Sequence, residues 1–173
     1  APLIAMVGHG SSSANNPFFA AYDCGACSGR PGLANARVFA LMANRADVRT
    51  LLSRQGLTIP ESTRFIGAIH DTTRDEILFL DEQLLAASHK PLLAKLKQSF
   101  VTALRRTALE RSRRFADVPL QKSEKSAQKE CIARSEMLFE PRPEYTHATN
   151  SVGIVAPRSL TEGLFLDRRA FFN

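Results

Sequence analysis

His9 and Cys24 are the two residues whose types and surroundings could do chemistry. His9 follows a short apolar run and stands between Gly8 and Gly10, and Cys24 follows within the same polar loop. Imidazole and thiolate are ligands that zinc favours, and a catalytic zinc site usually has three protein ligands and one position for water. The glycines let the backbone approach a metal closely. Spacing alone is a weak signal for a metal-binding loop, and a structural histidine with two buried thiols is the more common arrangement.

Three other kinds of site use the same residues. The pair Cys24 and Cys27 resembles a thioredoxin-type dithiol, although the Ser-Gly-Arg-Pro-Gly that follows does not open the helix which that motif needs. The His-Gly-Ser turn that begins at His9 resembles the opening of a class II metal chelatase. A hydrolase nucleophile at Ser11 is disfavoured because no Gly-x-Ser-x-Gly elbow is present. With three cysteines in total, a metal or redox role in a reducing compartment is a better interpretation than a disulfide framework.

The elements around this loop form a βαβ pattern. Residues 2–7 and 63–70 are apolar runs that predict two buried strands. Between them, apolar residues at helical spacing from Leu33 predict a helix, and a second helical stretch ends at Gly56. We therefore expect an α/β fold, with a mostly parallel sheet covered by helices.

The predicted strands would bring further polar residues to the His9 loop. Sites in parallel sheets lie beyond the carboxyl ends of the strands, so His70 and Asp71 are expected at the same edge as that loop. There they could hydrogen-bond to a metal ligand and so fix its orientation. The alternative is that His70 is a structural histidine whose hydrogen bonds are satisfied at the end of the strand.

A helical excursion is expected after this core. Residues 91–116 place apolar side chains at helical spacing and carry several arginines, which we expect to be solvated or paired with acidic groups of a missing part. Residues 117–135 are polar and lysine-rich, as in a linker or the end of the excursion, and residues 151–157 return to strand character. The expected division is an α/β core with half of the metal site over 1–85, a helical excursion or linker over 86–140, and a return to the core over 141–173.

Composition excludes several classes of protein. The net charge of +6 raises nucleic acid or an anionic membrane surface as partners. However, the chain has two Tyr and no Trp, and its aromatic residues are not interleaved with Arg or Lys, so we expect a basic solvated face and no nucleic acid. No stretch approaches the roughly 18 apolar residues of a membrane span. The first residues lack the pattern of a signal peptide, and a start inside a strand without Met suggests a fragment or a processed product.

Several longer blocks resemble the DabA family, whose members are the large subunit of a two-component bacterial inorganic-carbon uptake system. The first block runs from Gly8 to Pro17 and is long enough to be specific. The resemblance covers nearly the whole chain and continues through residues 22–27, 35–37, 65–73, 110–114, 142–145, 156–159 and 167–171. Because family members are several times longer, the chain resembles an internal segment.

The resemblance implies a zinc site like that of β-type carbonic anhydrases, formed by two Cys, one His and one Asp. The family's His and second Cys correspond to His9 and Cys24. Its first Cys and its Asp belong to an upstream Cys-x-Asp-x-Arg motif that this chain lacks, since neither Cys27 nor Cys131 has an Asp at the needed place. The rest of a DabA chain would supply them. The isolated segment is therefore expected to bind zinc poorly and to be inactive.

The resemblance also implies a reaction, a partner and a location. The reaction is zinc-assisted, vectorial hydration of CO₂ to bicarbonate, and the partner is a membrane subunit of the DabB type. The segment would lie peripherally at the cytoplasmic face of the bacterial inner membrane. Two alternatives stay open: a non-catalytic interaction segment of the same assembly, and a chelatase-like metal-binding domain.

The remaining candidates have weaker support. Ser11, Ser12 and Arg30 could contact bicarbonate, although loop hydroxyls more often satisfy their own turn. Cys27 is an alternative metal ligand. No role is assigned to three isolated residues: His89, Cys131 and His147.

Overall fold

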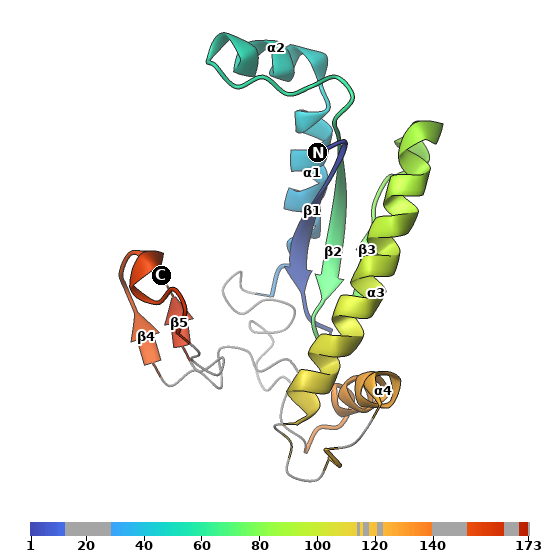
Figure 1. The fold of residues 1–173 in the computed structure, drawn as a ribbon, viewed down its shortest axis with the longest axis vertical. Helices are drawn as coiled ribbons and strands as arrows, with labels where there is room; N and C mark the ends of the chain where they lie inside the picture. Colours follow the sequence, from blue (N-terminus) through green and yellow to red (C-terminus); the bar gives the residue numbers. More distant parts are fainter. Residues whose placement is uncertain are drawn as a thin grey trace.

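Two parallel strands form the centre of the fold. β1 (Leu3–Gly10) and β2 (Arg64–Asp71) pair over their whole length, and β3 (Glu76–Phe79) adds to β2 in the antiparallel direction. This arrangement comes from a computed structural model, drawn in Figure 1. The described residues are 1–12, 29–113, 115, 118–120, 123–139, 152–164 and 170–172.

The crossover between the two parallel strands is helical, as expected from the sequence. α1 (Leu33–Ala43) is followed by α2 (Ala46–Arg54). Gly56, with a φ of 87°, ends α2: its N–H donates to Ser53 O, and the next N–H donates to Leu52 O. The α/β class with a parallel strand pair is therefore confirmed.

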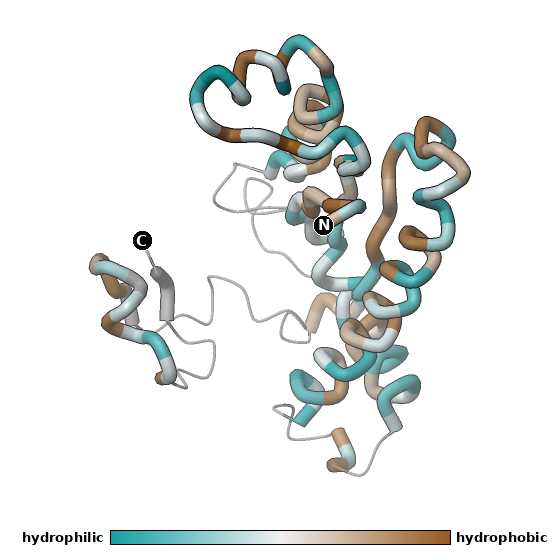
Figure 2. The backbone as a smooth tube through the Cα atoms, turned by 45° about the horizontal axis from the view of Figure 1, so that its top comes forward, coloured by the Kyte–Doolittle hydropathy of each residue, from teal (hydrophilic) through white to brown (hydrophobic). Residues whose placement is uncertain are grey.

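The two faces of the sheet are covered by different helices (Figure 1). On one face α1 buries only alanines, and its backbone approaches Gly67 so closely that a Cβ there would lie 3.0 Å from Arg37 Cα. On the other face lies α3 (Lys90–Ser112), whose polar and apolar residues alternate along the helix in Figure 2. α3 contributes to the apolar core with Leu93, Leu96 and Phe100. The rest of that core comes from Leu3, Ala5, Ile66, Ala68, Ile77, Phe79 and Leu85.

The third strand corrects the expectation of a mostly parallel sheet. β3 is only four residues long and returns immediately after a tight turn that includes Asp75 at a φ of 52°. Short 3₁₀ turns, η3 (Glu82–Leu84) and η4 (Ala87–His89), then lead into α3. His89 holds this connection in place, because its Nε2 lies 2.9 Å from the carbonyl oxygen of Ser62 just before β2.

The stretch expected to be a linker or the end of the excursion contains another helix. α4 (Glu124–Arg134) begins after Ser123, whose hydroxyl accepts a hydrogen bond from the N–H of Ser126. It packs on α3 through Ala127 and Cys131, both fully buried. Burial raises the pKa of the Cys131 thiol, which donates to the carbonyl of Ala108 at 3.7 Å. Cys131 is thus a core residue of the α3–α4 pair.

The C-terminal part contains a separate sheet. β4 (Val152–Ile154) and β5 (Ala170–Phe172) pair in parallel, with the turn η6 (Arg158–Leu160) between them. The division into core, excursion and return stays a prediction. Within the described part of the chain, no helix is long and apolar enough to span a membrane.

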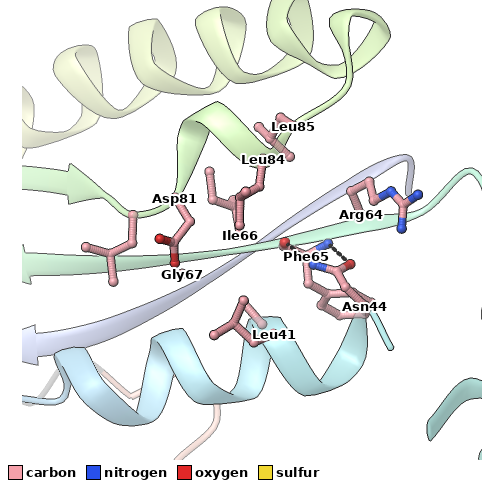
Figure 3. A pocket seen from close by; sticks show the side chains of 11 residues that line it. Leu41, Asn44, Arg64, Phe65, Ile66, Gly67, Asp81, Leu84 and Leu85 are labelled. Atoms are coloured by element: carbon pink, nitrogen blue, oxygen red, sulfur yellow. Dashed lines mark hydrogen bonds between the residues drawn. The ribbon is translucent and has the colours of Figure 1, made fainter. Parts of the chain in front are cut away.

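A side chain completes the edge of β2 where β3 does not reach. The amide of Asn44 donates to Phe65 O at 2.8 Å and accepts from Phe65 N at 3.0 Å (Figure 3). This pair of bonds imitates a neighbouring strand. Asn44 follows α1, so the same contact fixes the end of that helix against the sheet.

A buried ion pair joins the β2–β3 turn to α3. Arg111 donates to both carboxylate oxygens of Asp75, at 3.0 and 2.5 Å, and the two side chains are 4% and 0% exposed. Burial on its own lowers the pKa of Arg111, but the hydrogen bonds and charge of Asp75 raise it. The end of α3 is therefore connected to the carboxyl edge of the sheet by a desolvated, doubly hydrogen-bonded pair.

Loss of the Asp75 carboxylate is expected to destabilise the fold by about 3–5 kcal/mol, because it leaves the charge of Arg111 buried and unpaired. The measurement is denaturant unfolding of Asp75→Asn, which keeps a residue type that tolerates the positive φ. Asp47→Asn is the matched control, since it breaks an exposed Arg45–Asp47 pair and should cost less than about 1 kcal/mol. Equal effects of the two substitutions would contradict the assignment.

Gly8→Ala tests the close approach between β1 and the segment before α1. A Cβ on Gly8 would lie 2.4 Å from the carbonyl oxygen of Gly32, which is backbone and cannot rotate away. We expect a loss of about 1–3 kcal/mol in the free energy of unfolding. Gln98→Ala on the exposed side of α3 should change it by less than about 0.5 kcal/mol.

Candidate functional site

Two histidines lie opposite each other at the carboxyl edge of the sheet. His9, near the end of β1, is paired in register with His70 of β2, and His9 is exposed while His70 is half-buried. In the same register Ala5 lies opposite Ile66, both in the core under α3. Because side chains alternate between the faces of a strand, both imidazoles continue that face. α3 covers the apolar part of this face, and the two histidines lie at the end of that apolar part.

His70 has an unusual environment. Its Nε2 is buried and makes no hydrogen bond to any described residue. Burial is the main cause that lowers the pKa of His70, and the charges of Arg111 and His9 act in the same direction against Asp75 and Asp71. His70 is therefore neutral at neutral pH and offers an unused ring nitrogen beside His9.

The carboxylate of Asp71 organises the backbone at this edge. It accepts hydrogen bonds from the N–H groups of Ser12, Thr73 and Arg74, at 3.3, 3.1 and 3.2 Å. The hydroxyls of Thr73 (2.7 Å) and Ser12 also donate to it. Burial acts to raise the pKa of Asp71, but these hydrogen bonds outweigh it and lower the pKa. Asp71 is an ionised scaffold whose two oxygens are already in use.

The polar loop after β1 begins and ends beside His9. At its start, the N–H of Ser12 donates to Thr73 Oγ1 at 3.0 Å, and the Ser11 hydroxyl, which is buried, lies 3.5 Å from the same atom. At its return, the N–H of Gly32 donates to the carbonyl of His9 at 2.7 Å. Ser12 and Gly32 therefore both lie close to the backbone at the end of β1.

The structure places only part of the expected site. Cys24, Cys27 and His147 lie outside the described residues. Arg30 is described and exposed. Among the described residues, no three His, Cys, Asp or Glu side chains come together as a metal site would require. Of the two expected zinc ligands, His9 lies in the described part of the chain, near the end of β1.

Sequence reasoning missed two parts of this edge. The hydrogen bonds of Thr73 were not expected, although Asp-x-Thr after a strand is a common way to close a turn. The Asp75–Arg111 pair was also missed, because nothing in the sequence connects residues so far apart. His70 and Asp71 were expected here, and both lie at this edge.

Comparison with known proteins identifies the family. A family model described as "Probable inorganic carbon transporter subunit DabA" matches residues 1–173. Proteins with that description from Azotobacter vinelandii and Nitrosospira multiformis are 51% and 50% identical over 100% and 98% of this chain. A "Probable inorganic carbon transporter subunit DabA 2" from Sorangium cellulosum is 50% identical over 99%.

These matches cover 20%, 19% and 17% of the three relatives, so the chain spans about a fifth of their length. No solved structure is significantly similar to it. The family model matches the entire chain, including the strand ends that carry His9 and His70. The chain therefore belongs to the DabA family of probable inorganic carbon transporter subunits.

Proposed function

We propose that this segment contributes His9 and Cys24 to a carbonic-anhydrase-like zinc site in the complete DabA subunit. The observation that carries the proposal is the pair of anchors at the end of β1: the N–H groups of Ser12 and Gly32 are both hydrogen-bonded there, and Cys24 lies between these two residues in the sequence. An imidazole and a thiolate are a suitable half of a zinc ligand set. The remaining Cys and Asp ligands would come from the rest of the DabA chain.

The described residues suit this role. His9 is exposed at the carboxyl edge of parallel strands, where ligand sites of open α/β sheets lie. Its neighbour His70 is neutral and presents an unpaired ring nitrogen, and Asp71 fixes the backbone on both sides. The parallel β1–β2 pair with helical cover is also compatible with a β-carbonic-anhydrase-like sheet. We assign Asp71 to loop positioning and not to metal binding, because its oxygens are used by the loop.

The proposed reaction is hydration of CO₂ to bicarbonate, made vectorial by a membrane subunit of the DabB type. When bound, zinc supplies the Lewis acidity that makes water a nucleophile near neutral pH. The chain's own residues hold the metal, fix the loop and shape the entrance to the site. The names of the relatives, which describe transporter subunits for inorganic carbon, support the substrate. The subunit would act peripherally at the cytoplasmic face of the inner membrane.

Loss of either ligand is expected to weaken zinc retention and to abolish inorganic-carbon uptake. In a full-length DabA protein that contains this segment, His9→Ala and Cys24→Ala should lower zinc affinity by at least about 100-fold, more than the loss of a supporting residue costs. Metal analysis and cellular uptake of labelled bicarbonate are the measurements. Cys131→Ala is the control, since it removes a buried thiol from the α3–α4 core and should leave zinc content unchanged. Full zinc occupancy in Cys24→Ala would refute the ligand assignment.

Asp71→Asn is expected to destabilise the edge by about 1–3 kcal/mol at pH 7, because the amide cannot accept all five hydrogen bonds. The folded-state pKa of Asp71 is lowered, so its stabilisation is present above the unfolded pKa of about 3.9 and is lost as the pH falls through the folded value. The stability difference between wild type and variant should therefore shrink below about pH 4. Denaturant unfolding curves of wild type and variant at pH 7 and below about pH 4 test this. A stability difference that is the same at both pH values would contradict it.

A further inference from the structure

β3 has an open edge. Among the described residues its only neighbouring strand is β2. The N–H of Leu80 donates to Gly67 O at 2.8 Å, and antiparallel pairs alternate between bonded and non-bonded residues. Leu78 therefore directs its backbone groups toward β2, while Ile77 and Phe79 direct theirs away from the sheet. This row of backbone donors and acceptors, which has no strand partner among the described residues, is a template for another strand.

A groove of about 520 Å³ lies along this open edge. Ile77 and Phe79 line it from the face under α3, and Glu76 and Leu78 line it from the opposite face. All four consecutive residues of β3 line it, so the groove follows the strand. The groove is therefore a space beside β3 as well as a space between β3 and α3.

The wall opposite β3 is apolar and incompletely covered. α3 supplies Phe100, Val101 and Leu104, which follow one another along one side of the helix. Val101 is 38% exposed, and Leu78 on the strand is 61% exposed. Apolar side chains beside an unpaired strand edge favour the addition of an extended segment.

The two ends of the groove carry basic residues that differ in whether an acidic partner is present. At one end Lys97 binds both oxygens of Glu82 at 2.7 Å. At the other end Arg105 has a buried Nε with no hydrogen-bond partner among the described residues. Its neighbours on α3 each have a carboxylate partner, Arg106 in Glu124 and Arg111 in Asp75, although the Nε of Arg111 is also without a hydrogen bond among the described residues. Among the described residues Arg105 lines the groove and has no carboxylate partner, so a carboxylate in the groove would form a charge-assisted bond with its guanidinium.

The groove also has a suitable length. Lys97 and Arg105 are about two helical turns apart, which is roughly 12 Å along the axis of α3. An extended chain covers that distance with about three or four residues. β3 has four residues, so a segment of this length would pair with the whole strand.

We propose that an extended segment from the rest of the DabA chain adds to the open edge of β3, fills the groove with apolar side chains and places a carboxylate on Arg105. The relatives are about five times longer than this chain, so most of the same polypeptide is available to cover it. A segment tethered in the same molecule binds at a high effective concentration, unlike a second copy or a separate subunit. The outer edge of β3 is separate from the proposed zinc site, which would lie at the ends of β1 and β2.

Hydrogen–deuterium exchange at residue resolution in a purified full-length DabA protein tests the proposal. The amides of Ile77 and Phe79 should exchange at least about 100-fold more slowly than unstructured amides, as expected of hydrogen-bonded groups. The amide of Leu78 is the internal control, because β2 protects it in either case. Rapid exchange at Ile77 and Phe79 would overturn the proposal. Protection that appears only with the membrane subunit, or that rises with protein concentration, would overturn the assignment to the same chain.

Arg105→Gln tests the carboxylate, with Arg106→Gln on the next residue as the matched control. Arg105→Gln should speed exchange at Ile77 and Phe79 by about tenfold or more and leave Leu78 unchanged, because it loosens only the added strand. Arg106→Gln should leave all three amides unchanged, since its side chain is 73% exposed and points to Glu124. Unchanged exchange in Arg105→Gln, or equal acceleration at Leu78, would overturn the role of Arg105.

Discussion

The carboxylate of Asp71 is the interaction on which the candidate site depends. Two strands end side by side, and each must release its chain into a loop without leaving backbone donors unsatisfied. Asp71 accepts hydrogen bonds from backbone N–H groups just after β1 and just after β2, so one ionised group satisfies donors of both loops. His9 comes just before the loop that follows β1, and His70 comes just before the turn that follows β2. Their positions relative to each other follow from strand pairing and are held by this carboxylate.

The two sides of the sheet solve different packing problems. Toward α1 the contact is close, with alanines and Gly67 at the interface, so the helix is fixed by backbone proximity and by Asn44. Toward α3 the contact uses bulky apolar side chains, and at the carboxyl edge it changes to the Asp75–Arg111 pair. That change lets polar and titratable residues occupy one end of an otherwise apolar face. Among the described residues no strand covers the outer side of β3, and the groove lies there.

The sequence by itself determined the class of the fold and the place of the site. Two continuous apolar runs with helical spacing between them imply parallel strands, and parallel strands imply a shared carboxyl edge for His9, His70 and Asp71. Gly56 ended its helix as expected, because a positive φ is a local requirement that glycine meets. Family membership was also predicted from the sequence, since blocks of residues along nearly the whole chain resemble the DabA family, and the family model matches residues 1–173. All of these depend on local or periodic patterns.

Only the tertiary structure decided the features that depend on distant contacts. β3 escaped prediction because four residues carry too little periodicity, and its direction is set by the turn at Asp75. α4 escaped because its buried residues include Ala, Cys and Arg, whose burial is decided by α3 and not by hydropathy. The partners of the arginines also depend on tertiary contacts: among the described residues Arg111 and Arg106 each pair with a carboxylate, and Arg105 does not. A sequence records which charges a chain carries, whereas folding decides which of them meet, because pairing depends on residues far apart in sequence coming together in space.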